Sequence, residues 1–260
     1  KGGANFDPKQ CTQNEIRRFS KAYARALCSH IGAYSDVPAG DINVSATEIG
    51  YMFSEQLKMT GDYSGDFSGK PLSLGGSKLR IEATGYGLVY FLANAMLEIN
   101  ESIEGKTINI SGAGNVALHA AEKAVALNAT VLSLSNSRGT LFCKTGLSQH
   151  DINWLKQEAA KHENALQALA DKTEHCFLAG ETPWSTQADI ALPCATQNEI
   201  DEKEAKQISS NIKFALVEGA NMPCTKKAID VLTQSSLIYA PGKAANAGGV
   251  ILSGFEMQQN

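Results

Sequence analysis

Two closely spaced glycines mark the stretch of this sequence that is best suited to bind phosphate groups. Gly112, Gly114 and Ala117 follow the β-branched run at residues 107–111. We predict a strand, a tight turn and a helix, because Gly112 permits a sharp turn and Gly114 leaves the backbone open to a pyrophosphate. The first N–H groups of the helix and its positive end would bind the phosphates. The stretch therefore predicts a dinucleotide site, although such a turn also occurs without a ligand.

The end of the next predicted strand, residues 129–135, bears on which dinucleotide fits. That end carries Ser135, Asn136 and Arg138. An Asp or Glu about 20 residues after the glycines usually binds the ribose hydroxyls, and the sequence has none at this point. Hydroxyl, amide and guanidinium groups can all donate to a 2′-phosphate, which a carboxylate would repel. We therefore predict a preference for NADP over NAD. Use of both coenzymes stays open, as does a merely solvated role for Arg138.

A second kind of chemistry is suggested by one lysine and one aspartate in glycine-containing loops. Lys1 precedes two glycines, and Asp41 ends the Pro- and Gly-containing loop at residues 37–41. Hydride transfer needs a charged group at the substrate carbon and a proton relay besides the coenzyme. Burial in a closing cleft lowers the pKa of an ammonium, so that it can exchange a proton near neutral pH. The alternative is that both side chains are simply solvated, as most loop charges are.

Composition limits the class of protein. The 260 residues suffice for one large or two modest domains, and the net charge of −4 with scattered basic residues gives no indication of nucleic acid or of a membrane as partner. The six cysteines form no Cys-x-x-Cys pair and the five histidines are not clustered, so we expect no metal site and assign the histidines no chemical role. Reduced thiols are usual in the cytoplasm, which is the expected location.

The elements that would position these residues fall into two blocks. In residues 1–75, capping boxes at Thr12-x-x-Glu15 and Ser45-x-x-Glu48 begin two predicted helices. The stretch 61–76 is rich in Gly, Ser and Asp, and we place a domain boundary near its end. The predicted domains are therefore residues 1–75 and residues 76–260, of which the second is the dinucleotide-binding domain.

Strands and helices alternate in the second block. After residue 107, short apolar strands are expected at residues 188–192, 213–217 and 237–240, and each ends in a polar loop. This alternation predicts an α/β fold of the Rossmann type, a doubly wound parallel sheet covered by helices on both faces. Ligands of such sheets lie beyond the carboxyl ends of the strands. The three loops are therefore expected to surround the nicotinamide end of the coenzyme.

Seven motifs resemble those of one family, the hexameric glutamate dehydrogenases, and together they extend over essentially the whole chain. They are KGGANFDP at residues 1–8, DVPAGD at 36–41, RIEATGYG at 80–87, SGAGNVA at 111–117, PCATQN at 193–198, ANMP at 220–223 and NAGGVILSGFEM at 246–257. The resemblance implies that the first predicted domain, residues 1–75, is the C-terminal part of a substrate and oligomerisation domain.

The resemblance implies roles for residues on the substrate side. Lys1 matches the catalytic lysine of the family, and Asp41 matches its proton-relay aspartate. Gly40 matches a backbone contact to the substrate, and Ser253 matches a hydroxyl that holds the distal carboxylate of the substrate. Arg80 matches an arginine at the hinge side of the cleft. The alternative is that Ser253 has no contact with substrate and is simply a small residue that permits close helix packing.

The resemblance also implies contacts to the coenzyme. Thr84 matches a contact near the nicotinamide carboxamide, and Asn115 matches one at the pyrophosphate turn. Asn221 and Asn246 are expected beside the nicotinamide ribose. Thr84 has an alternative role as the N-terminal cap of the helix that follows it.

The function implied by the resemblance is an NADP-dependent, homohexameric glutamate dehydrogenase that converts 2-oxoglutarate and ammonia into L-glutamate. Because the chain starts at Lys1 and stops at Asn260, we expect a fragment that lacks both ends of the enzyme, including further substrate-binding lysines, and that binds coenzyme better than it turns over substrate. Two alternatives stay open: a leucine or phenylalanine dehydrogenase of the same architecture, and a non-catalytic module that binds NADP.

Overall fold

The computed structural model describes residues 3–41, 44–158 and 162–259. The chain divides into two compact units, and each is considered by itself: unit 1 comprises Lys1–Ile81 and Val250–Asn260, and unit 2 comprises Glu82–Gly249. Within the described ranges, no helix combines the length and the apolar character that crossing a membrane requires.

Unit 1 is built on two helices whose starts the sequence predicted. Its elements are η1 (Pro8–Gln10), α1 (Gln13–Leu27), α2 (Ala46–Thr60), η2 (Leu72–Leu74) and residues 250–258 of α10 (Gly248–Gln258). Both capping boxes are confirmed: Thr12 and Glu15 bond reciprocally at the start of α1, and Ser45 and Glu48 do so at the start of α2. The buried core of unit 1 is small and consists of Ala24, Ile49, Met52, Phe53 and Phe67.

A buried ion pair holds α10 to the rest of unit 1. Lys70 Nζ lies 3.2 Å from Glu256 Oε1, and both side chains are fully buried. The Glu256 carboxylate also accepts the backbone N–H of Gly69 at 2.9 Å and that of Lys70 at 3.1 Å. A buried charge without a partner is very costly, so both residues are needed together. The pair therefore fixes the segment 67–70 against α10.

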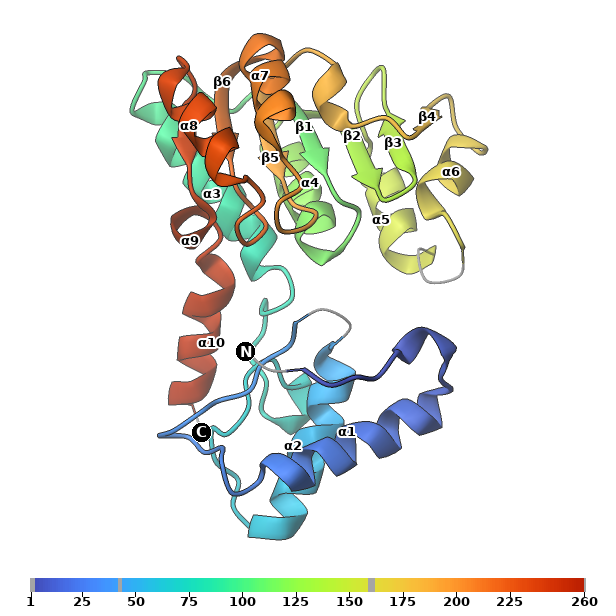
Figure 1. Ribbon diagram of the computed structural model, residues 1–260, viewed down its shortest axis with the longest axis vertical. Coiled ribbons are helices and arrows are strands. Elements are labelled where there is room, and N and C mark those ends of the chain that lie inside the picture. The colour runs from blue at the N-terminus through green and yellow to red at the C-terminus, as the bar shows by residue number, and fades with distance from the viewer. Residues whose placement is uncertain (1–2, 42–43, 159–161, 260) are drawn as a thin grey trace. The chain divides into compact units, whose positions relative to one another are not determined.

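Unit 2 contains a seven-stranded sheet in the order β4-β3-β2-β1-β5-β6-β7 (Figure 1). Its strands are β1 (Thr107–Ser111), β2 (Thr130–Asn136), β3 (Gly139–Phe142), β4 (Cys176–Ala179), β5 (Ala188–Pro193), β6 (Ile212–Val217) and β7 (Ile238–Ala240). Its helices are α3 (Ala83–Leu97), α4 (Asn115–Ala126), α5 (Gln149–Glu158), α6 (Ala165–Ala170), η4 (Pro183–Ser185), α7 (Glu202–Asn211), α8 (Lys226–Gln234) and α9 (Gly242–Ala245), and α10 begins at its end.

The predicted doubly wound sheet is confirmed in its central part. Strands β2, β1, β5, β6 and β7 are parallel, whereas β3 and β4 add to the β2 edge in antiparallel fashion. The antiparallel pair was not predicted, because each of these strands has only four residues. A two-residue turn, Ser137-Arg138, joins β2 to β3. Arg138 therefore lies in a hairpin and not, as in a parallel unit, in a loop leading to a helix.

Helices cover both faces of the sheet, as the sequence predicted. Ile190 and Leu192 of β5 face a core shared with α3 and α4, and Ala191 between them faces a second core shared with α7 and α8. On the first face α3 approaches α4 closely at Gly85, where a Cβ atom would lie 2.6 Å from the Ala120 nitrogen. Close packing of α3 on α4 brings the start of α3 near the start of α4.

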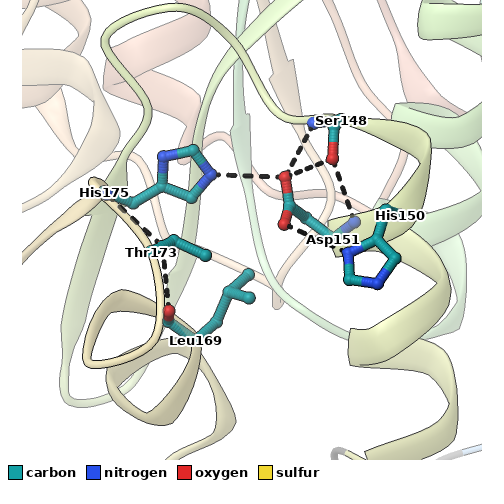
Figure 2. A network of polar contacts seen from close by, with 6 residues as sticks. All are labelled: Ser148, His150, Asp151, Leu169, Thr173 and His175. Atoms are coloured by element: carbon teal, nitrogen blue, oxygen red, sulfur yellow. Dashed lines mark hydrogen bonds and ion pairs between the residues drawn. The ribbon is translucent and has the colours of Figure 1, made fainter.

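Figure 2 shows a polar network that ties α5 to the segment between α6 and β4. The Asp151 carboxylate accepts the Ser148 N–H at 3.0 Å and the Ser148 hydroxyl at 2.5 Å, and it lies 3.4 Å from His175 Nε2. His150 Nδ1 is 4.0 Å from the same carboxylate but is exposed. Two histidines therefore gather at one aspartate, which their spacing in the sequence did not indicate. Asp151 lies in the first turn of α5 and is buried, so we interpret the network as structural.

The pKa of Asp151 reflects this role. Burial alone would raise the pKa of its carboxyl group, but the donors from Ser148 and the neighbouring His175 outweigh burial and hold the pKa below its ordinary value. A carboxylate with a lowered pKa in the folded state stabilises the protein above the pKa of the unfolded chain. That stability is lost as the pH falls through the folded value.

We therefore expect Asp151→Asn to lower the free energy of unfolding by about 1–3 kcal/mol at pH 7, because the amide cannot accept from all of these donors. The difference from the wild type should shrink as the pH falls through the lowered folded-state pKa of Asp151, where the wild-type carboxylate itself becomes protonated. Urea unfolding followed by the fluorescence of Trp154 and Trp184, both in unit 2, measures the effect. Asp230→Asn on the exposed side of α8 is the control, with an expected change within about 0.5 kcal/mol. Equal effects of the two substitutions would contradict this account of the network.

Candidate functional site

The turn after β1 has the geometry that a phosphate-binding turn requires. Gly112 has φ +87°, and a Cβ atom there would lie 2.8 Å from the carbonyl oxygen of Cys194. Both the positive φ and the close approach of the β5 end therefore require glycine at this position. The Gly112 N–H donates to Ser135 Oγ at 3.1 Å, which fixes the turn to the end of β2.

The start of α4 is open on the side where a ligand would lie. Gly114 is the N-terminal cap residue in an extended conformation, and a Cβ atom there would meet nothing within 4 Å. Asn115 follows as the first helical residue and is exposed. The first N–H groups of an α-helix have no partner within the helix, and the helix dipole adds positive charge at this end. The 12-residue helix thus offers donors to a pyrophosphate on the side of Gly114, where a Cβ atom would meet none of the described atoms within 4 Å.

The end of β2 differs from the expectation in one respect, because the structure brings an acid to it. Arg138 Nη2 lies 2.6 Å from Glu163 Oε1, and both side chains are largely exposed. Asn136 accepts the Arg138 N–H at 2.9 Å and donates to Asn164 Oδ1 at 2.8 Å. Glu163 was missed because it stands 25 residues beyond Arg138 in the sequence. The guanidinium is therefore shared between a carboxylate of the chain and any phosphate that binds here.

The loops after β5, β6 and β7 meet at one edge of the sheet, as predicted from parallel strands. Asn246 Nδ2 donates to Asn221 Oδ1 at 2.9 Å and to the Gly219 carbonyl at 3.2 Å. The two asparagines expected beside the nicotinamide ribose therefore contact each other. Glu218, which the sequence analysis did not select, accepts the Tyr239 hydroxyl at 2.9 Å and the Gly242 N–H at 2.7 Å. Its buried carboxylate thus ties the end of β6 to β7 and to the start of α9.

Thr84 lies in the first turn of α3, and the start of this helix packs against the segment that follows β7 at the same edge. A Cβ atom at Gly248 would lie 2.2 Å from the Ala83 carbonyl oxygen, so α3 begins against the segment that follows Asn246. The cap residue of α3 is Glu82, which makes no side-chain cap bond. The alternative that Thr84 is only a helix cap is therefore wrong. Thr84 is half-buried, with the Gly248 segment beside its helix.

Glu199 is a further residue that sequence reasoning missed. It follows the PCATQN motif, and its Oε1 atom accepts the Ala195 N–H at 3.1 Å. Burial raises the pKa of its carboxyl group to about 7, although hydrogen bonds from Ser111 and from the Ala195 and Thr196 amides act in the opposite direction. The neighbouring thiol of Cys194 is buried and its pKa is raised well above the ordinary value, so it is no candidate nucleophile.

Unit 1 gathers two of the residues expected on the substrate side. The segment 38–40 runs beside Ser68, since Ala39 and Ser68 form a parallel bridge and the Ser68 N–H donates to the Pro38 carbonyl at 2.9 Å. The Ser68 hydroxyl is hydrogen-bonded to the Ser253 hydroxyl of α10. Gly40 and Ser253 therefore both lie close to Ser68, which the sequence analysis had not selected because it stands 185 residues before Ser253.

The remaining residues predicted on the substrate side are Lys1, Asp41 and Arg80. Lys1 lies outside the described residues. Asp41 is exposed, and its carbonyl oxygen accepts the Val44 N–H at 2.9 Å. Arg80 is half-buried, and its Nε atom has no hydrogen-bond partner among the residues that the structure describes. Burial lowers the pKa of Arg80, while Glu256 acts against this. An orphaned guanidinium nitrogen suits a ligand with an anionic group.

Family models match both parts of the chain. The one described as Glutamate/Leucine/Phenylalanine/Valine dehydrogenase matches residues 75–260, and the one described as Glu/Leu/Phe/Val dehydrogenase, dimerisation domain, matches residues 1–58.

Individual relatives extend the comparison. The NADP-specific glutamate dehydrogenase of Psychrobacter sp. (strain TAD1) is 51% identical over 263 residues, which cover 100% of this chain and 58% of that protein. The NAD-specific glutamate dehydrogenase of Bacteroides fragilis (strain YCH46) is 44% identical over 261 residues, which cover 100% of this chain and 59% of that protein. The solved structure of Plasmodium falciparum glutamate dehydrogenase superposes with a TM-score of 0.93 at 41% identity, over 98% of this chain and 55% of that one. The chain thus spans a little over half the length of these relatives, whose names include both coenzymes.

Proposed function

The chain belongs to the glutamate/leucine/phenylalanine/valine dehydrogenase family, and from this we propose that the protein containing it catalyses the reversible reductive amination of 2-oxoglutarate by ammonia and NADPH to L-glutamate. The reaction consumes the hydride of NADPH, ammonium and one further proton, and it releases water. The similarity of the whole chain to proteins named as NADP-specific glutamate dehydrogenases supports the activity.

One observation within unit 1 favours glutamate over the apolar substrates of the family. The Ser68 and Ser253 hydroxyls meet beside Gly40, where the resemblance expects the distal end of the substrate. Two hydroxyls can donate to a carboxylate, whereas a site for leucine, phenylalanine or valine needs an apolar surface. Arg80, with its unpaired buried nitrogen, adds a positive charge to unit 1 that suits an anionic substrate.

The chain's own residues then divide the chemical work. When bound, the coenzyme supplies the hydride. The Lys1 ammonium, a role carried over from the resemblance, polarises the 2-oxo group and stabilises the oxyanion that develops when ammonia adds. Asp41 accepts a proton from ammonia and returns one to the departing water. Ser68 and Ser253 orient the distal carboxylate.

Coenzyme binding is assigned to unit 2. The residues proposed for the pyrophosphate are Gly112, Gly114 and Asn115, and those proposed for the adenosine end are Ser135, Asn136 and Arg138. Thr84, Asn221 and Asn246 are proposed for the nicotinamide end. The open surface at the start of α4 supports the first group, and the contact between the two asparagines supports the last. NADP is the proposed coenzyme, with NAD as a possible second one.

Domain roles and assembly belong to the same proposal. Residues 1–75 are proposed as part of the substrate and oligomerisation domain, and residues 76–260 as the dinucleotide-binding domain. The match of residues 1–58 to a dimerisation domain supports oligomer formation, and a homohexamer is proposed from the family resemblance. The six cysteines are free, which supports the proposed cytoplasmic location.

The activity is tested on the complete protein with a panel of 2-oxo acids, ammonia and either reduced coenzyme. We expect 2-oxoglutarate to have the highest kcat/KM, with NADPH preferred to NADH. Preference for the oxo acids of leucine or phenylalanine would show that the enzyme acts on an apolar amino acid and not on glutamate. Binding of NADPH without its oxidation by any oxo acid would favour a non-catalytic module.

The proton relay is tested by Asp41→Asn in the complete protein. Loss of general acid–base catalysis usually lowers turnover by about 10²–10⁴-fold, and we expect kcat to fall within this range. The dissociation constant of NADPH should be unchanged, since Asp41 lies in unit 1 and the proposed coenzyme contacts lie in unit 2. A fall of less than about threefold in kcat, on the order of 0.65 kcal/mol of barrier, would contradict the assignment.

The coenzyme preference is tested by Arg138→Ala. The dissociation constant of NADPH should rise about tenfold, which equals about 1.4 kcal/mol, while that of NADH changes less than about twofold, since only NADPH has the 2′-phosphate. Glu163→Gln is the matched variant: removing the competing carboxylate should leave Arg138 free and tighten NADPH binding. Equal effects of Arg138→Ala on both coenzymes would show that its guanidinium does not read the 2′-phosphate.

A further inference from the structure

Glu199 lies at the point where the sheet is expected to hold a ligand. The connection from β1 leads to β2 on one side, while β5 lies on its other side, so the strand order reverses between β1 and β5. In such sheets the ligand crevice opens beyond the carboxyl ends of these two strands. The loop that follows β5 at this edge carries Glu199, whose carboxyl group is hydrogen-bonded to the backbone N–H of Ala195 in the same loop.

The Glu199 carboxyl group is part of a short chain of contacts that leads to the phosphate-binding turn. Its Oε1 atom accepts the Ala195 N–H at 3.1 Å, and the preceding Cys194 donates its N–H to Ser111 Oγ at 2.9 Å. A Cβ atom on Gly112 would lie 2.8 Å from the Cys194 carbonyl oxygen and 3.2 Å from the Ala195 Cα atom. The carboxyl group therefore braces the backbone that packs directly against Gly112.

The backbone on the other side of Glu199 is anchored as well. The Ile200 N–H donates to the Pro223 carbonyl at 2.9 Å, and the Ile200 carbonyl accepts the Thr225 N–H at 3.0 Å. Glu199 thus stands between the loop after β5, which it braces, and the loop after β6, to which its neighbour is fixed. The backbone next to Glu199 is therefore fixed to the loop after β6, while the carboxyl group itself is hydrogen-bonded to the loop after β5.

The titratable groups that face Glu199 add negative charge or none. They are the Cys194 thiol at the end of β5, the Cys224 thiol after β6 and the Glu204 carboxyl group of α7. Burial raises the pKa of both thiols, so they are neutral at physiological pH. Among the described residues, Glu199 forms no ion pair with a lysine, arginine or histidine. Desolvation without a cation accounts for a carboxyl pKa of about 7.

We propose that Glu199 is a positioning residue of the coenzyme site, whose carboxyl group holds residues 193–198 against the Gly112 turn and whose negative charge, when present, opposes the coenzyme phosphates. Coenzyme binding then takes up a proton. The inference rests on the proposed function only in that a dinucleotide binds at Gly112. It requires neither the substrate nor the catalytic residues of that proposal.

The sign of the pH dependence follows from linkage. Negative phosphates near Glu199 raise the pKa of its carboxyl group further, so the complex holds a proton that the free protein loses near pH 7. Affinity is therefore greatest below the pKa of the free protein and falls as the pH rises through that value.

The test measures the dissociation constant of NADH for the complete protein between pH 6.5 and 8.5. NADH is the probe because it lacks the 2′-phosphate, which itself titrates near pH 6. Burial lowers the pKa of His119 in α4, so this histidine stays neutral over the range. We expect the dissociation constant of the wild type to rise at least about fivefold from pH 6.5 to 8.5.

Three variants separate charge from position. Glu199→Gln keeps an acceptor for the Ala195 N–H but has no charge, so its dissociation constant should vary less than about twofold over the range and match the wild-type value at pH 6.5. Glu199→Leu also loses the acceptor for the Ala195 N–H, so it should bind NADH more weakly than Glu199→Gln does at every pH. Glu202→Gln removes the same charge from the exposed first turn of α7, where it pairs with Lys206, and should keep the wild-type slope.

Each result bears on the inference. A wild type without the slope, or a Glu199→Gln variant that retains it, would overturn the inference while leaving the coenzyme site intact. Absence of NADH and NADPH binding at any pH would overturn both the inference and the proposed function. If Glu199→Gln does not fold, calorimetry of the wild type at pH 7.5 in two buffers of different ionisation enthalpy decides the matter, because proton uptake on NADH binding supports the inference and its absence overturns it.

Discussion

The close approach of β1 and β5 at Gly112 is the constraint on which the proposed coenzyme site depends. These neighbouring strands are parallel, so both end at the same edge of the sheet, and the Cys194 carbonyl would lie 2.8 Å from any Cβ atom at position 112. Only a glycine with positive φ lets the chain turn here and begin α4 directly. This turn directs the first N–H groups of α4 towards the edge where the coenzyme is proposed to bind.

Several carboxylates lie in or against the segments that follow strands of the sheet, and each is already engaged by donors of the chain. Glu218 accepts from Tyr239 and from the backbone of Gly242, Glu163 pairs with Arg138, and Glu199 accepts the Ala195 N–H. The Glu199 carboxyl group has a pKa of about 7, so its charge can change under physiological conditions. The charge at this edge of the sheet therefore depends on the hydrogen bonds and the burial of each carboxyl group, and not only on the number of acidic residues.

Local patterns allowed much of the fold to be predicted. The capping boxes at Thr12 and Ser45 and the turn at Gly112 each depend on residues within a few positions of one another, so their spacing is visible in the sequence. The gathering of the loops that carry Asn221 and Asn246 was predicted from one topological rule, that parallel strands end at a common edge, whereas the two asparagines themselves were selected from the family resemblance.

The residues that were missed come together over long distances in the chain. Ser68 and Glu163 were missed although their partners Ser253 and Arg138 were selected, because no repeating pattern links the members of each pair and only the packing of finished elements brings them into contact. Glu199 stands next to a recognised motif, yet its raised pKa comes from burial, which a sequence does not state. The antiparallel strands β3 and β4 were too short to show an alternating pattern.

The central claim, that a dinucleotide lies across the start of α4, is tested most directly by Gly114→Val in the complete protein. Gly114 has an ordinary extended backbone, and a Cβ atom there would meet none of the described atoms within 4 Å, so the variant should fold with only the modest loss of stability that valine causes at a helix N-cap. The added side chain would occupy the space of the pyrophosphate. Calorimetric titration should show one NADPH per wild-type chain and at least about hundredfold weaker binding, about 2.7 kcal/mol, in the variant. Unchanged affinity in a folded Gly114→Val variant would contradict the claim.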